Sequence, residues 1–229
     1  NDEEELEAWA EEHTKDKTIG PEIYEKIFEL LLRLKANYIW PAMHVNYFNE
    51  NLRNGELADE MGIVVGTSHC DMLLRSNQNE WNPWVLKKGY HELKYDYSIE
   101  GENRERIKEY WRKSLEQNRN YENTYTIGMR GIHDSGFVAS KINGDTELSE
   151  KQVQEKKIKL MQEVFSDQRA IICQVFGEEK AKKAVQVFVP YKEVLDLYDA
   201  GLDVPDDVTI IWVNDNFGHM RRYPDSEEL

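Results

Sequence analysis

The chain contains little cysteine, fewer basic than acidic residues, and no long apolar run. Its two cysteines, Cys70 and Cys173, are too few and too far apart to predict a disulfide framework or a zinc site. No stretch approaches the run of about 18 apolar residues that a transmembrane helix needs. With 29 Lys and Arg against 44 Asp and Glu, the net charge is −15, which repels phosphate backbones and anionic lipid headgroups. We therefore expect no nucleic-acid partner and no membrane partner.

Catalytic motifs of several enzyme classes are also absent. Neither GxGxxG nor GxxxxGK(S/T) follows an apolar run, which disfavours an oxidoreductase or phosphate-dependent enzyme as an alternative. GxSxG is missing, so acyl transfer from a serine nucleophile has little support. A metal hydrolase is a further alternative, but HExxH and similar ligand spacings are missing. Its ligands would be His44, His69, His133 and Asp134. We expect neither a metal nor another cofactor.

Short apolar runs predict five strands. Three of them are close to continuously apolar and β-branched, as strands covered on both faces of a parallel sheet are. Helical patterns lie between the runs, which indicates repeated βα units. The fold class is therefore α/β, either a doubly wound sheet or a (β/α)8 TIM-barrel-like fold. The predicted strands are NYIWPA (37–42), GIVVGT (62–67), TYTIGM (124–129), AVQVFV (184–189) and VTIIWV (208–213).

Four segments carry helical periodicity. The segment 149–177 begins with a capping box, Ser149 and Gln152, and ends at Gly177. The other three cover 21–36, 103–118 and 191–201. Residues 75–103 form a long connection with Trp81, Trp84, Tyr90, Tyr95 and Tyr97 among polar residues. Because long βα loops commonly form substrate surfaces, we expect this aromatic loop to face a ligand.

Each predicted strand is followed by polar residues. In a parallel barrel the carboxyl ends of all strands lie on one rim, so these tips meet there. The opening Asn1-Asp2-Glu3 fits the tip of a strand that precedes residue 1. Six tips and five visible strands predict an incomplete barrel that belongs to a larger enzyme. The tips within the chain include His44, Ser68, Arg130, Tyr191 and Asn214.

The acidic residues at these tips permit glycoside hydrolysis. This reaction needs two carboxyl groups across the scissile bond, one protonated to help the leaving oxygen depart and one ionised to activate water or attack carbon. The candidates are Asp2, Asp134, Glu193 and Asp215.

Four long blocks of the chain carry a family resemblance. They are KANYIWPAMHVNYFNEN, ADEMGIVVGTSHCDMLLRSNQNEW, TYTIGMRGIHDSGF and DDVTIIWVNDNFGHMRRYP. Together they resemble glycoside hydrolase family 115, the xylan α-1,2-glucuronidases, from NDE at the start to RRYP near the end. The resemblance implies that residues 1–229 form a single, partial catalytic TIM-barrel domain of a longer multidomain enzyme.

The resemblance also implies an activity and a setting. The implied reaction releases glucuronic acid or 4-O-methylglucuronic acid from α-1,2-linked decorations of glucuronoxylan or its oligosaccharides. It proceeds with inversion of configuration and without a metal. The parent enzyme is expected to be secreted or periplasmic and to form a homodimer.

Particular residues match functional positions of the family. A carboxylate of the NDE tip matches Asp2, and the acidic residue after GMRG matches Asp134. An acidic residue in PYKEV matches Glu193. An asparagine in VNDNFGH matches Asn216, with Asn214 and Asp215 beside it.

The chain also departs from the family pattern at three places. Ile132-His133 stand where many relatives have Glu-Gly, and Asp71-Met72 stand where relatives usually have Glu-Pro. A tyrosine and an asparagine on the last strands of the family have no counterpart.

We expect Glu193 and Asp134 to act as acid and base, in an order that the sequence leaves open. Asp2 would bind sugar hydroxyls or share the base role. Inversion requires the two carboxyl groups to stand about 6.5 to 9.5 Å apart, which tips from different parts of the rim can supply. One of the pair should have its pKa raised by burial and by its carboxylate neighbours. Asn216 can orient a sugar hydroxyl without adding negative charge.

An acidic substrate needs a local cation in so negative a chain. Arg130 is the first candidate, because its fork can hold a carboxylate through two hydrogen bonds. Lesser candidates are His69, His219 and Arg75.

The main alternative function is a non-catalytic carbohydrate-binding barrel. In that case the aromatic loop 81–97 and the rim asparagines would hold a glycan without cleaving it. The acidic residues at 3–5 and 11–12 are expected to form a solvated helix face.

Overall fold

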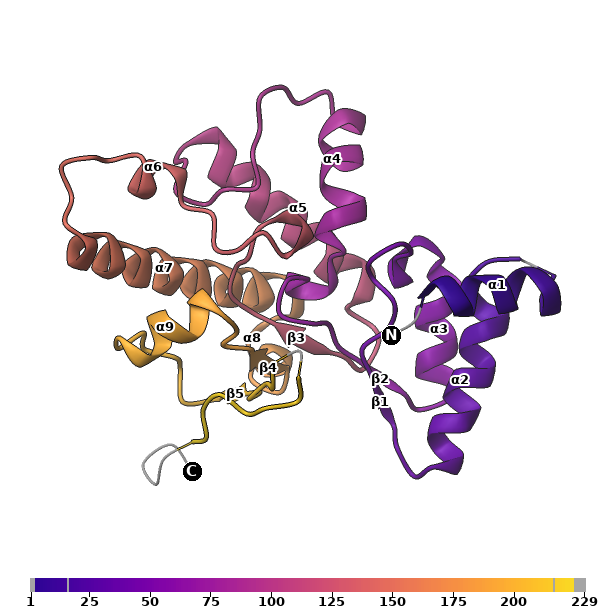
Figure 1. Ribbon diagram of the computed structural model, residues 1–229. Helices are drawn as coiled ribbons and strands as arrows, with labels where there is room; N and C mark the ends of the chain where they lie inside the picture. Colours follow the sequence, from indigo (N-terminus) through magenta and orange to yellow (C-terminus); the bar gives the residue numbers. More distant parts are fainter. Residues whose placement is uncertain (1–2, 16, 216, 225–229) are drawn as a thin grey trace.

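The computed structural model describes residues 3–15, 17–215 and 217–224, so Asp2 and Asn216 lie outside the described residues. The chain is α/β, as expected, with helices between successive strands (Figure 1). The strands are β1 (Tyr38–Ile39), β2 (Val64–Val65), β3 (Thr124–Thr126), β4 (Val185–Phe188) and β5 (Val208–Ile210). The helices are α1 (Glu3–His13), α2 (Pro21–Arg33), α3 (Leu52–Glu60), α4 (Asn77–Lys87), α5 (Glu102–Asn118), α6 (Ser140–Asn143), α7 (Glu150–Phe176), α8 (Glu178–Ala181) and α9 (Glu193–Asp199).

The described strands pair in parallel, and their order in space follows the sequence. β1 pairs with β2, and β3, β4 and β5 pair in that order. A parallel bridge between Val65 and Asn123 links the end of β2 to the start of β3. The regular strands are shorter than the predicted apolar runs, because only part of each run forms ladder hydrogen bonds. Sequential parallel strands with helices between them are the arrangement of a (β/α)8 barrel, and the barrel itself stays a prediction.

Gly66, just past β2, lies beneath a contact between side chains of the two neighbouring strands. A Cβ at this position would collide with the hydroxyls of Tyr38 on β1 and Thr124 on β3. Those two hydroxyls hydrogen bond to each other at 2.8 Å. Side chains of the strands on either side of β2 therefore meet across it, which requires a residue without a side chain at position 66.

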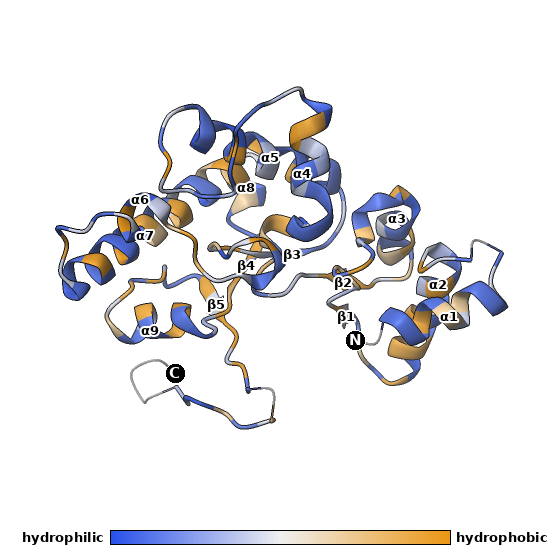
Figure 2. Ribbon diagram, turned by 45° about the horizontal axis from the view of Figure 1, so that its top comes forward, coloured by the Kyte–Doolittle hydropathy of each residue, from blue (hydrophilic) through white to orange (hydrophobic). Residues whose placement is uncertain are grey.

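The helices bury one face against the strands and against each other. α7 packs along α5 and alternates hydrophobic and hydrophilic bands along its length (Figure 2). The predicted capping box is confirmed, because Ser149 and Gln152 exchange side-chain and backbone hydrogen bonds. Gly177 ends α7 with a φ of 76°, which glycine adopts without strain. No helix in the described part of the chain is both long and apolar enough to cross a membrane.

The prediction of an aromatic loop facing a ligand is wrong. Trp81 lies in α4, and it is 1% exposed, while Tyr97 is fully buried. The Trp81 ring packs against Tyr95 and Tyr110, and the indole of Trp111 donates to the Tyr95 hydroxyl. These aromatic side chains fill the core between α4 and α5. A glycan-binding role for 81–97 therefore loses its basis.

Glu3 also differs from expectation, because it is not part of a solvated face. It is 7% exposed, and its two carboxylate oxygens accept the backbone N–H groups of His44 and Val45 at 3.1 and 2.5 Å. The start of α1 is thereby tied to the segment that follows β1. The other acidic residues of α1 are exposed or half-buried, as predicted.

Candidate functional site

Arg130, just past β3, lies at the centre of the candidate site. Its side chain is buried, and its guanidinium contacts two carboxylates. Nε lies 2.6 Å from Oδ1 of Asp134, and Nη1 lies 3.1 Å from Oε1 of Glu193. Nη1 also donates to the carbonyl oxygen of Tyr191 at 2.8 Å. One buried cation therefore brings together the two acidic residues that the sequence proposed as a pair.

Two further side chains surround Asp134. Lys192 donates from Nζ to Oδ2 at 3.2 Å, and Nε2 of His69 lies 3.3 Å from Oδ1. Oδ1 itself is buried and makes no aligned hydrogen bond in the described structure, so its contacts with Arg130 and His69 are electrostatic in character. The tips of β2, β3 and β4 thus converge on one carboxylate.

The surroundings decide the charge of these groups. Burial by itself raises the pKa of Asp134, but the nearby charges of Arg130 and Lys192 outweigh it, and the net pKa is lowered. The pKa of Asp134 is therefore shifted in the direction opposite to that predicted for the acid. Burial lowers the pKa of His69, against the attraction of Asp134. At neutral pH the site holds an ionised Asp134 beside an uncharged imidazole.

Glu193, the first residue of α9, is held from two sides. Its Oε1 accepts the backbone N–H of Phe137 at 2.7 Å, and its Oε2 accepts from Nη1 of Arg130 at 3.2 Å. Gly136, beside this carboxylate, has a φ of 92°, a conformation that glycine adopts without strain. The carboxylate is therefore fixed in position by the rim segment after β3.

The backbone around these side chains is strained. His133, Asp134 and Lys192 have φ values of 57°, 55° and 51°, which residues other than glycine rarely adopt. Such conformations cost about 1–3 kcal/mol each and persist where the surrounding structure requires them, often at functional sites. Here the strain coincides with the segments that carry the two carboxylates, which supports a functional role for this cluster.

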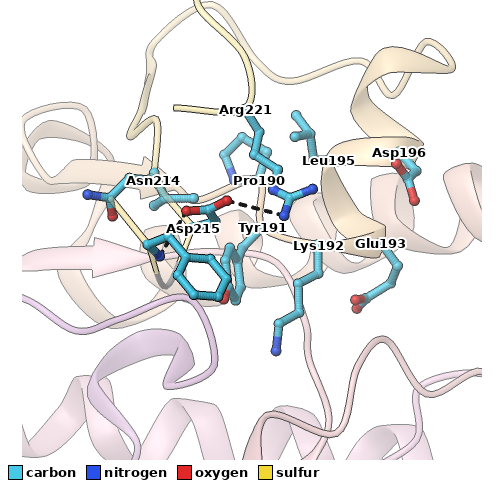
Figure 3. Close-up of a pocket in the computed structure, with 11 residues that line it drawn as sticks. Pro190, Tyr191, Lys192, Glu193, Leu195, Asp196, Asn214, Asp215 and Arg221 are labelled. Atoms are coloured by element: carbon cyan, nitrogen blue, oxygen red, sulfur yellow. Dashed lines mark hydrogen bonds and ion pairs between the residues drawn. The ribbon is translucent and has the colours of Figure 1, made fainter. Parts of the chain in front are cut away.

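A first cavity of about 470 Å³ opens beside Glu193 (Figure 3). Lys192 and Glu193 form one side of it, and Asn214 with Arg221 form the other. Its lining therefore combines two cations, Lys192 and Arg221, with an amide and the carboxyl groups of Glu193, Asp196 and Asp215. The predicted residues Glu193, Asn214 and Asp215 share this cavity.

Asp215 shapes the loop on which it lies. Its Oδ1 accepts the backbone N–H groups of Phe217 and His219 at 2.9 and 3.0 Å, and Oδ2 lies 3.2 Å from Nη2 of Arg221. The backbone hydrogen bonds, with that from His219 first, lower the pKa of Asp215. A bridge between Asn214 and Met220 closes the same loop. The side chain of His219 is 80% exposed and lines neither cavity described here.

Arg75 does not join the cluster. It is buried, its Nη1 lies 2.8 Å from Oε1 of Glu80, and its Nε and Nη2 donate to the carbonyl oxygen of Tyr110. Its guanidinium also stacks on the Tyr110 ring. This arginine holds α4 against α5, so its predicted role as a substrate cation has no geometric support.

A second cavity, of about 550 Å³, is lined in part by Asp134. It is lined by residues that follow β1, β2 and β3, among them His44, Ser68, Asp71 and Asp134. Asp71 is 7% exposed, and burial raises its pKa to about 7. The hydrogen bond from the backbone N–H of Asn77 opposes this shift only partly. The two carboxyl groups of this cavity therefore have pKa values shifted in opposite directions.

Replacing Asp71 by Asn should make the stability less dependent on pH. Because the folded-state pKa is raised, the native protein keeps a proton that the unfolded chain releases between about pH 4 and 7, and the free energy of unfolding falls across that window. The amide of the variant does not titrate in this range. The free energy of unfolding of Asp71→Asn should therefore increase relative to that of the wild type as pH rises, by at most about 4 kcal/mol above pH 7. Thermal unfolding from pH 4 to 8 measures this, and parallel curves for the two proteins would contradict it.

Within the described residues, no group of three or more His, Cys, Asp or Glu is placed to hold a metal ion. The site instead presents two carboxylates after neighbouring parallel strands, Glu193 in the lining of the first cavity and Asp134 in that of the second. This is the arrangement of a glycoside hydrolase.

The comparison with protein families agrees with that class. The model of glycosyl hydrolase family 115 matches residues 1–229, and the chain belongs to this family. A solved structure has the same fold with a TM-score of 0.82 and 35% identity, and it is described as a novel family GH115 4-O-methyl-α-glucuronidase, BtGH115A, with specificity for decorated arabinogalactans. The match covers 100% of this chain and 28% of that one, so the chain spans 28% of the length of that protein. The comparison with curated proteins finds no match.

Two residues of the site were not selected from the sequence. Lys192 stands in the tip after β4, beside Glu193, and Asp71 stands in the tip after β2. The only feature of the sequence that could have identified them as site residues is their position directly after predicted strands. Neither the strained backbone of Lys192 nor the burial of Asp71 can be deduced from neighbouring residue types.

Proposed function

We propose that this chain carries the carboxylate pair of an inverting α-glucuronidase. Its reaction would release glucuronic acid or 4-O-methylglucuronic acid from α-1,2-linked decorations of glucuronoxylan. The observation that carries the proposal is the contact of Asp134 and Glu193 with a single buried guanidinium, that of Arg130. Family membership and the likeness to a solved α-glucuronidase support it.

The contacts of the pair with one guanidinium set an upper limit on their separation, and inversion itself is taken from the family resemblance. Both carboxylates contact nitrogens of one rigid group at 2.6 and 3.1 Å, which limits the separation of those oxygens to about 8 Å. The spacing for inversion is about 6.5 to 9.5 Å, and the limit is compatible with it. Because the pKa of Asp134 is lowered, we assign it the base that activates water, and Glu193 the acid at the leaving oxygen.

The substrate's carboxylate needs a cation, and the structure favours Lys192 for it. Arg130 was the first candidate from the sequence, but its guanidinium is buried and already binds two carboxylates. The side chain of Lys192 is 52% exposed and lines the first cavity next to Glu193. An ammonium on this side chain can contact a uronate while it stays close to Asp134. In this proposal Arg130 positions the two acids, and Lys192 selects the acidic sugar.

The setting of the enzyme follows from the same proposal. Residues 1–229 would form one partial barrel domain of a longer, homodimeric enzyme that is secreted or periplasmic. Asp2 and Asn216, outside the described residues, keep their proposed roles with sugar hydroxyls. The alternative of a non-catalytic binding barrel is disfavoured, because three of the aromatic residues that it needs, Trp81, Tyr95 and Tyr97, are buried.

Release of the free uronic acid from glucuronoxylan by the full-length protein tests the function. We expect NMR to show the β-anomer of the uronic acid first, because inversion of an α-linkage produces it, followed by mutarotation. An arabinogalactan decorated with the same uronic acid, assayed in parallel, identifies the preferred glycan. Initial formation of the α-anomer would contradict the inverting assignment, and no release from either glycan would refute the activity.

A further inference from the structure

The short helix α6 begins against a part of the chain that is distant in sequence. Its first two N–H groups, those of Ser140 and Lys141, have no acceptor within the helix, and the side chain of the preceding Ala139 supplies none. Oδ2 of Asp96 accepts the N–H of Ser140 at 2.9 Å. Oγ of Ser98 accepts the N–H of Lys141 at 3.1 Å. Two side chains from the connection between α4 and α5 therefore satisfy the start of α6.

Asp96 is itself held firmly in this place. It is 1% exposed, and its Oδ1 accepts both the backbone N–H and the hydroxyl of Ser98, at 2.9 and 2.6 Å. With the N–H of Ser140, three uncharged groups donate to its carboxylate. Its own carbonyl oxygen accepts the side-chain amide of Asn103, in the first turn of α5, at 2.9 Å. A buried polar cluster whose members are satisfied is rigid, so Asp96 fixes α6 relative to α5.

The segment that precedes α6 carries a donor to Glu193. Phe137, three residues before the helix, donates its backbone N–H to Oε1 of Glu193 at 2.7 Å. On the other side of this donor, the carbonyl oxygen of Gly136 accepts the N–H of Gly131 at 2.6 Å. The N–H of Phe137 therefore lies on a short span that is fixed at both ends, and Asp96 fixes one of them.

We propose that Asp96 is a positioning residue for Glu193. It fixes the start of α6 and, through the segment 137–140, the N–H that orients the carboxyl group. The inference rests on the proposed function, in which Glu193 is the acid at the leaving oxygen. Asp96 is not among the described residues that line the two cavities, so its effect on the rate passes through this segment. A displacement of about 1 Å in a catalytic group costs about 10²-fold in rate, so a remote tie of this kind controls the reaction.

Initial rates of the full-length protein on two substrates, glucuronoxylan and an α-glucuronosyl fluoride, test this role. Asp96→Ala should lower kcat on the glycan by about tenfold and change KM by less than about twofold, because the acid is displaced while the sugar-binding groups stay in place. On the fluoride, which leaves without a proton, the loss should stay below about twofold. Asp96→Asn keeps one acceptor oxygen and should recover part of the rate on the glycan. Losses of equal size on both substrates would overturn the positioning role.

A double variant and a matched control narrow the test. In the Glu193→Gln background, Asp96→Ala should lower the rate on the glycan by less than about twofold, because both changes act through the same carboxyl group. Full additivity would show that Asp96 acts elsewhere and would overturn the proposal. Asp145→Asn removes a carboxylate that lies after α6 and contacts Glu147 and Lys156. Its rate should stay within about twofold of the wild type.

Amide hydrogen exchange gives a readout that does not depend on activity. Asp96→Ala should increase exchange at Phe137 and at the start of α6 by about tenfold, whereas Asp145→Asn should leave it unchanged. If Asp96→Ala does not fold, as judged by thermal unfolding, Ser98→Ala takes its place in both measurements, because it removes the acceptor for Lys141. Unchanged exchange at Phe137 in a folded variant would overturn the proposal.

The proposed function has its own readout in the release of uronic acid by the wild type. Release together with unchanged exchange in the variants leaves the activity and removes the positioning role of Asp96. Faster exchange at Phe137 without any release by the wild type leaves the tie between Asp96 and this segment and removes the activity.

Discussion

Replacing Glu193 by Gln is expected to reduce the release of uronic acid from the glycan by about 10³-fold or more, with folding intact. Glutamine has the shape of the acid, and its carbonyl oxygen can still accept the N–H of Phe137, which now lies 2.7 Å from Oε1. What it cannot do is donate a proton to a departing sugar oxygen. Initial rates on glucuronoxylan, with thermal unfolding as a check, measure the effect.

A substrate with a better leaving group separates the acid from the base. On an α-glucuronosyl fluoride, Glu193→Gln should recover most of its rate, because fluoride leaves without a proton. Asp134→Asn should stay inactive on both substrates, because activation of water is needed in each case. The reverse pattern would exchange the two roles, and near-normal turnover of both variants on the glycan would refute the pair.

Asp196 provides a matched control for the acidic residues. It lies three residues beyond Glu193 on α9, borders the same cavity, and forms no ion pair in the described structure. Asp196→Asn removes the same charge from the same helix, so its rate should stay within about threefold of the wild type. A loss comparable to that of Glu193→Gln would mean that the charge of α9, and not the position of one carboxyl group, sets the rate.

The sequence predicted the architecture better than it predicted the surroundings of each side chain. Alternating apolar runs and amphipathic segments are local signals, and they located the strands, α5, α7 and the capping box of Ser149 correctly. Polar residues after each strand identified the tips that converge on Asp134. These predictions succeed because they depend on residues close together in the chain.

Predictions that depended on distant partners failed more often. Trp81 and Tyr97 were assigned to a loop that faces a ligand, yet they complete a core with Tyr110 and Trp111, which lie in the following helix. Glu3 was assigned to a solvated face, although the N–H groups of residues 44 and 45 bind it. Composition along the chain cannot distinguish a polar or aromatic side chain that contacts solvent from one that satisfies a remote segment.

Arg130 shows the same limit within the site itself. An arginine at a strand tip of an acidic chain was interpreted as the cation for the substrate, because its fork can hold a carboxylate through two hydrogen bonds. In the structure the side chain is 2% exposed and holds Asp134 and Glu193 in place. The pairing with Glu193 joins the tips of β3 and β4, which no local pattern encodes. Its proposed task therefore changes from binding the substrate to positioning the two acids.

Replacing Arg130 by Met should therefore both destabilise the protein and shift its pH dependence. The change leaves two carboxylates close together without their shared cation and leaves the carbonyl of Tyr191 without its donor. Removing one partner of a buried ion pair costs about 3–5 kcal/mol, and the partial exposure of both carboxylates places the expected loss at about 3 kcal/mol or less. Denaturant unfolding at neutral pH measures the loss.

The sign of the pH effect follows from Asp134. Its pKa is lowered in the folded state, so its pairing stabilises the protein above the unfolded pKa and is lost as pH falls through the folded pKa. The difference in stability between wild type and Arg130→Met should therefore be largest near neutral pH and shrink in acid, where the carboxyl group is protonated in both. A difference that is independent of pH would show that Arg130 acts through packing and not through charge.

The double variant Arg130→Met with Asp134→Asn tests whether Arg130 stabilises the protein through its charge or through its packing. If repulsion and an unpaired carboxylate cause the loss, removing the carboxylate together with the cation should restore at least half of it, since the two effects are then coupled and not additive. Arg130→Lys should lie between wild type and Arg130→Met, because an ammonium keeps the charge but cannot contact Asp134, Glu193 and Tyr191 in the same geometry. Additive losses in the double variant would mean that the arginine and the aspartate stabilise the rim independently, and the positioning role of Arg130 would then have no energetic support.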